Sequence, residues 1–87
     1  MPLVPEGPFL YRAEVLEQLW RHGIQPSAHT RPVLVRDFVR DLYKYEIRQL
    51  RDRMLSNEFP RDEYAARVDA LRRCYPVLAL LPRQFVE

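Results

Sequence analysis

The sequence contains few of the residues on which disulfide frameworks and phosphate-binding loops depend. Among its 87 residues there is one cysteine, Cys74, and there are two glycines, Gly7 and Gly23. A single cysteine excludes a disulfide within the chain and is typical of a cytoplasmic protein. Because both glycines are isolated, the sequence has neither a P-loop nor a dinucleotide-binding fingerprint, and we expect no cofactor.

Long hydrophobic runs are also lacking. No run approaches the roughly 20 apolar residues of a membrane span, and the first residues lack the basic start and long apolar stretch of a secretory signal. We therefore expect a cytoplasmic protein without a membrane partner. Only Lys44 is a lysine among the 14 basic residues. Such arginine usage is typical of a GC-rich genome, and we expect a bacterial protein.

The composition predicts one small folded domain spanning residues 1–87. The chain is 47% hydrophobic and 30% charged, which is ordinary for a globular protein. A domain of this size buries only about 60–65% of the surface of its unfolded chain. We therefore expect no interior cavity for a small-molecule substrate, and association between subunits would add stability.

Apolar residues at helical spacing predict three helices, Phe9–His22, Pro32–Ser56 and Pro60–Tyr75. Gly23 is the expected end of the first helix, and Asn57 can adopt the left-handed conformation that closes the second. Thr30 is the expected N-cap of the second helix.

The prediction is an all-α three-helix bundle with a long central helix and a C-terminal apolar segment packed on it. Prolines predict an extended N-terminal arm over residues 1–8. The C-terminal tail, residues 76–87, could form helical turns or an extended segment across the core.

We find no catalytic or metal-binding constellation. The sequence has no G-x-S-x-G motif, and Cys74 is interpreted as a small buried or half-buried side chain. His22 and His29 lack carboxylates or thiolates at ligand spacing. We expect His22 to bond the last carbonyl groups of its own helix. The protein is predicted not to be an enzyme.

Glu46 is the one acidic residue inside the apolar arc of the central helix. An unpaired buried carboxylate is costly, so a partner is expected. Arg12, which lies in the apolar arc of the first helix, and Arg53 are the two candidates.

The apolar arc of the central helix is too wide for one covering layer. It extends over more than half the helical wheel, whereas an ordinary surface helix has a stripe of about 100°. We expect a second cover, such as another subunit, and therefore a protein that acts by protein–protein association, mainly self-association. The candidate interface residues are Phe38, Leu42, Tyr45, Leu78, Leu80 and Leu81.

A row of basic residues on the same helix offers an alternative. It lies within about 120° on the wheel, and it could follow a nucleic-acid backbone or an acidic partner. Asp37, Asp41 and Asp52 flank the row and partly neutralise it. The row consists of Arg36, Arg40, Lys44, Arg48 and Arg51. A third hypothesis is an accessory subunit of a larger enzyme.

Residues 47–71 resemble the SHOCT domain, a short helical hairpin. The matching residues are Leu50, Met54, Leu55, the break S-N-E-F-P, Asp62, Glu63, Tyr64 and Leu71. Asn57 stands where that family usually has glycine, and Pro60 where it usually has threonine. Both substitutions suit the same backbone, because asparagine tolerates the left-handed turn and proline starts helices. The resemblance implies a helix–helix interaction or oligomerisation element.

Overall fold

The computed structural model describes residues 8–87, and the expected arm over residues 1–8 falls outside that range except for Pro8. Within it the chain forms three α-helices and no strand, which confirms the all-α class. The α-helices are α1 (Ala13–Arg21), α2 (Pro32–Leu55) and α3 (Tyr64–Arg72). Three short 3₁₀ segments accompany them: η1 (Arg61–Glu63), η2 (Pro76–Ala79) and η3 (Pro82–Gln84).

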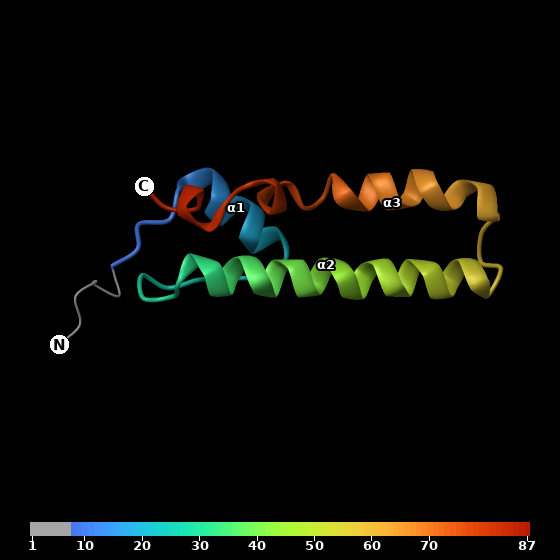
Figure 1. Cartoon of the computed structure of the whole chain (residues 1–87), viewed down its shortest axis with the longest axis horizontal. Coiled ribbons are helices and arrows are strands. Elements are labelled where there is room, and N and C mark those ends of the chain that lie inside the picture. The colour runs from blue at the N-terminus through green and yellow to red at the C-terminus, as the bar shows by residue number, and fades with distance from the viewer. Residues whose placement is uncertain (1–7) are drawn as a thin grey trace.

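The long helix α2 carries the other elements on its two halves. Figure 1 shows α1 and the C-terminal tail beside its first half and α3 running back along its second half. The 24 residues of α2 extend about 36 Å, whereas the 9 residues of α1 or α3 extend only about 14 Å. The arrangement does not confirm a three-helix bundle, because α1 and α3 cover different parts of α2.

The main core lies at the first half of α2. Val15 and Leu19 of α1 are buried against Val35 and Val39 of α2. The tail completes this core with Val77 and Phe85, together with Tyr75 directly before it. The tail therefore forms two 3₁₀ turns across the core, which settles the choice that the sequence left open.

The first helix is shorter than predicted, because residues before Ala13 pair with the end of the chain. Tyr11 and Val86 form an isolated antiparallel bridge. The backbone N–H of Arg12 donates to the carbonyl of Phe85 at 2.9 Å, and that of Glu87 donates to the carbonyl of Leu10 at 2.9 Å. These long-range bonds replace the helical turn that local spacing predicts from Phe9.

The second half of α2 and α3 form a helical hairpin in which Leu50 and Phe59 are buried. Asn57 has φ 61°, which confirms the predicted left-handed closure. Phe59, buried in the turn, lies beneath the guanidinium of Arg67, whose carbon is 4.1 Å from the ring centre. The third helix is shorter than predicted, because Pro60 leads first into η1 and α3 ends at Arg72.

Candidate association surface

The structure divides the six predicted interface residues into two groups. Phe38, Tyr45 and Leu81 keep 61%, 54% and 49% of their surface exposed. Leu42, Leu78 and Leu80 instead pack against the main core as partly buried side chains. A helical wheel of α2 could not distinguish the exposed Phe38 and Tyr45 from the partly buried Leu42. The tail that covers one side of α2 comes from more than 30 residues away in the sequence.

An exposed apolar stripe follows one side of α2. It consists of Leu34, Phe38 and Tyr45, separated by four and seven residues, a spacing that places side chains on one face of a helix. The exposed Asp41 lies on the same side of the helix between Phe38 and Tyr45. Leu34 is 58% exposed. It was not among the predicted interface residues, although its position one turn before Phe38 was the signal that could have identified it.

Beside the stripe is a hollow of about 320 Å³, lined almost entirely by apolar atoms. Its walls are Gly23, Ile24, Thr30, Leu34, Val35 and Phe38. The hollow therefore joins the end of α1 and its following loop to the stripe on α2. A concave apolar site of this size, at the lower end of ligand-pocket volumes, suits one large side chain.

Hydrogen bonds within the loop hold one wall of the hollow in place. The backbone N–H of Ser27 donates to the hydroxyl of Thr30 at 2.9 Å, and the N–H of Thr30 donates to the carbonyl of Ser27 at 3.1 Å. The hydroxyl of Thr30 thus binds within the loop, and the N-cap position of α2 belongs to Arg31. The prediction of Thr30 as N-cap was wrong.

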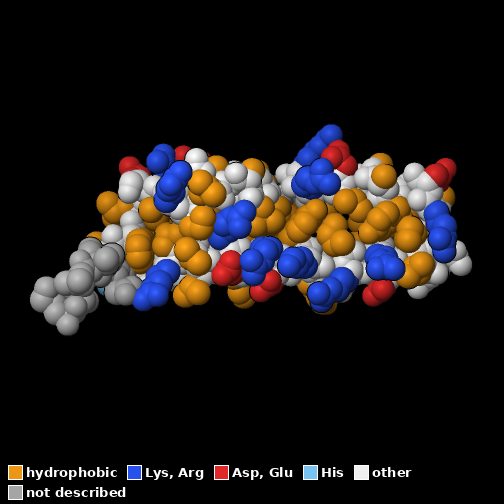
Figure 2. Space-filling view, viewed as in Figure 1, with side chains coloured by type: hydrophobic (Ala, Val, Ile, Leu, Met, Phe, Trp, Pro, Cys, Tyr) orange, Lys and Arg blue, Asp and Glu red, His pale blue; other side chains and the backbone are white. Residues whose placement is uncertain are grey.

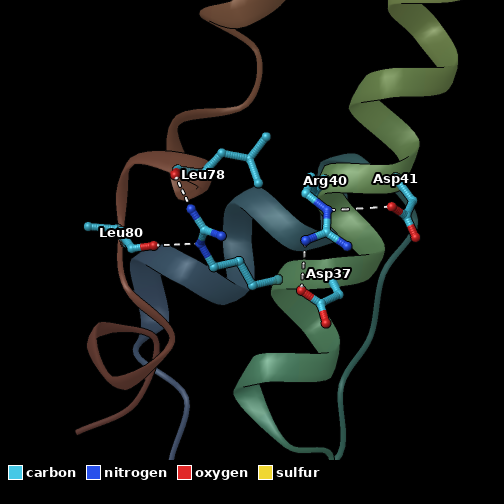
Figure 3. A network of polar contacts seen from close by, with 6 residues as sticks. Asp37, Arg40, Asp41, Leu78 and Leu80 are labelled. Carbon is cyan, nitrogen blue, oxygen red and sulfur yellow. Dashed lines mark hydrogen bonds and ion pairs between the residues drawn. The ribbon is translucent and has the colours of Figure 1, made fainter.

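Two members of the predicted basic row bind other groups of the same chain. Arg36 donates from Nε to the carbonyl of Leu80 and from Nη2 to the carbonyl of Leu78, both at 2.8 Å (Figure 3). Arg40 lies 3.3 Å from Asp37 and 3.5 Å from Asp41, as Figure 3 also shows. Arg36 therefore fastens the tail, and Arg40 is largely neutralised.

The other three members, Lys44, Arg48 and Arg51, are exposed and form no ion pair with any residue of the described range 8–87. Figure 2 shows basic side chains following α2 below the hydrophobic seam that separates it from α3. The three are spaced four and three residues apart, so they present their charges on one side of the helix. The cationic surface is thus about half as long as the sequence predicted.

Glu46 has a different partner from either arginine that we expected. Its carboxylate accepts a hydrogen bond from the Tyr75 hydroxyl. Arg12 instead donates to the carbonyl of Val86 at 3.2 Å, and Arg53 lies 3.4 Å from Glu58. Both predicted pairs were wrong, because the turn after α3 brings the phenol of Tyr75 to the carboxylate. The sequence position of Tyr75 gave no sign of this contact.

His22 and Cys74 also differ from prediction. The Nε2 of His22 donates to the carbonyl of Cys74 at 2.7 Å, not to the carbonyls of its own helix, and the imidazole stacks on Tyr75 with ring centres 4.2 Å apart. Cys74 is exposed, and its thiol lies 3.5 Å from the carbonyl of Ala70. Through these contacts His22 joins the end of α1 to the turn between α3 and the tail.

A second hollow, of about 640 Å³, lies between α2 and α3. Glu46, Asp52, Arg53 and Arg67 give its lining both signs of charge, and Cys74 is at one end. Within residues 8–87 no group of three histidine, cysteine or acidic side chains is placed to hold a metal ion. None of the described helices is long and apolar enough to cross a membrane.

Comparison with protein-family models, with curated proteins and with solved structures gave no match to this chain. The candidate surface is therefore interpreted from its own geometry.

Proposed function

We propose that this chain is a small, non-enzymatic, cytoplasmic module that acts by protein–protein association, with self-association as its main form. The observation that carries the proposal is the exposed stripe of Leu34, Phe38 and Tyr45 beside an apolar hollow. Large apolar side chains exposed on one helix face mark an association site more often than scattered exposed residues do. The resemblance of residues 47–71 to a helical oligomerisation hairpin supports the same class of function.

The size of the stripe sets the strength of association. If each large side chain offers about 200 Å² when fully exposed, the three residues leave about 350 Å² of mostly apolar surface in water. Buried on both copies it amounts to about 700 Å², below the roughly 1,200 Å² of standard stable interfaces. We therefore propose a weak complex whose formation depends on protein concentration.

Substitution within the stripe tests this function. Phe38→Glu places a charge at the centre of the stripe and should hold the protein near its monomer mass of 10.5 kDa in light scattering. Val33→Glu is the matched control, since Val33 is 54% exposed on another side of the same helix. The control should associate as the unmodified chain does. Equal masses for all three proteins would exclude the stripe as the association site.

A second candidate function rests on Lys44, Arg48 and Arg51, whose charges are not neutralised by the described residues. Three phosphate contacts would give nucleic-acid binding with a salt slope near −2.7. Arg48→Glu should weaken retention on DNA, whereas Arg40→Glu should change it little because Arg40 is already paired. Equal effects of the two substitutions would exclude this row as the binding site.

An accessory role on a larger enzyme would use the same apolar stripe. In that case the unmodified chain would stay monomeric at all concentrations and would co-purify with one larger protein, and Phe38→Glu would abolish the co-purification.

A further inference from the structure

Resting on the proposed function, we infer that the stripe binds a second copy of this chain with the two α2 helices antiparallel. Phe38 of each copy enters the hollow of the other. The contact is isologous, which means that one surface must supply both the protruding group and its receptor.

The shape of the surface meets that requirement. Phe38, which is 61% exposed, borders the hollow, and Leu34, which is 58% exposed, lines the same hollow one turn earlier. A rotation of 180° about an axis near the level of residue 36 places Phe38 of one copy opposite Leu34 of its partner, and the reverse. The four side chains then form one cluster around the axis, and Tyr45 lies toward the loop that precedes α2 in the other copy.

Charge selects the antiparallel orientation. A parallel pair would bring Asp41, which lies beside the stripe between Phe38 and Tyr45, close to its own copy, and like charges at matching positions repel. In the antiparallel pair the two Asp41 residues are about 15 Å apart along the helix, beyond the screening length of about 8 Å in physiological salt. The helix dipoles are also opposed in this orientation.

The available area predicts a transient dimer. The stripe offers about 350 Å² per copy, or about 700 Å² for the pair. With the walls of the hollow added, this stays in the size class of weak complexes, below about 1,200 Å². We therefore expect dissociation on dilution rather than a permanent dimer.

Spin-label distances distinguish the two orientations. Leu55→Cys in a Cys74→Ser background places the label at the far end of α2, on a residue that is 50% exposed and outside the stripe. Replacing Cys74 leaves one labelling site, and serine can keep the contact that the exposed thiol makes with the Ala70 carbonyl. The antiparallel pair predicts a label separation near 57 Å along the helix, whereas a parallel pair predicts about 10 Å plus the label arms.

A second label serves as the control. Val33→Cys in the same background lies close to the axis, so its separation should be short in either orientation and reports whether a dimer is present. A short distance at residue 33 with a long one at residue 55 is the expected result. Short distances at both positions would overturn the antiparallel pairing while leaving self-association intact.

Two further results are decisive. The absence of any dipolar signal, together with a monomer mass at the same concentration, would overturn the proposed self-association itself. A dimer whose distances are unchanged by Phe38→Glu would overturn the assignment of Phe38 to its interface.

Discussion

At the residue scale, Arg36 has a specific structural role that its place in a row of basic residues did not indicate. It stands at the first turn of a basic row, yet its guanidinium donates two hydrogen bonds of 2.8 Å to the tail. The accepting carbonyls belong to Leu78 and Leu80, which pack against the main core next to the buried Val77. Arg36 thus couples α2 to the segment that closes the main core.

Replacing Arg36 should therefore destabilise the fold. We expect Arg36→Met to lower the free energy of unfolding by about 2 kcal/mol, since hydrogen bonds to charged groups contribute about 1.5–3 kcal/mol and the tail can regain some bonds to water. Arg40→Met is the control, because its ion pairs are exposed and contribute about 0–1 kcal/mol. Urea unfolding of both variants measures the difference, and equal losses would show that Arg36 does not fasten the tail.

Tyr11 gives the main core a dependence on pH. Burial raises the pKa of its phenol, which donates to the Thr30 carbonyl. As pH rises through the unfolded value near 10, the unfolded chain loses the proton first and the folded chain still holds it. The free energy of unfolding therefore falls with rising pH from about 10 up to the folded pKa.

Tyr11→Phe should remove this part of the alkaline decline, although it also removes one hydrogen bond and lowers stability at neutral pH. Thermal unfolding of both proteins between neutral pH and pH near 11 provides the comparison. If the difference in melting temperature between the two proteins is the same at every pH, Tyr11 does not contribute to the alkaline loss of stability.

At the element scale, the left-handed helix ends were predicted correctly, whereas the Thr30 N-cap and the contacts between distant residues were not. Asn57 and Gly23 close helices where the sequence predicts, because left-handed backbone selects these residue types locally. The shortening of the first helix depends on pairing with Val86, and the partner of Glu46 is Tyr75, 29 residues away. Neither contact leaves a periodic pattern in the sequence, so neither could be predicted from spacing.

The turn at Asn57 determines how the hairpin between α2 and α3 closes. Left-handed backbone costs a residue with a β-carbon about 1–2 kcal/mol, and asparagine is among the residues that tolerate it best. We expect Asn57→Ala to lower the free energy of unfolding by about 1 kcal/mol and Asn57→Gly to leave it equal or higher. Ser56→Ala, in the neighbouring exposed position with negative φ, is the control for side-chain loss. A higher free energy of unfolding for Asn57→Ala than for Asn57→Gly, measured with denaturant, would contradict this account.

At the scale of the whole molecule, two short helices cover a long one only in part. Every residue of α3 keeps some exposure, and the main core is confined to the first half of α2. The sequence-based expectation that α2 has a second covering layer came from the width of its apolar arc. The structure divides that arc into a side covered by the tail and an exposed stripe. The stripe keeps Phe38 and Tyr45 of the six predicted interface residues and adds Leu34.

The central claim is that this stripe brings two copies together, and sedimentation equilibrium of the unmodified chain tests it most directly. From low micromolar to millimolar concentration, the account predicts a weight-average mass that rises from 10.5 kDa toward twice that value. Phe38→Glu should stay at the monomer mass over the same range. A folded unmodified chain that keeps the monomer mass at every concentration would contradict the account.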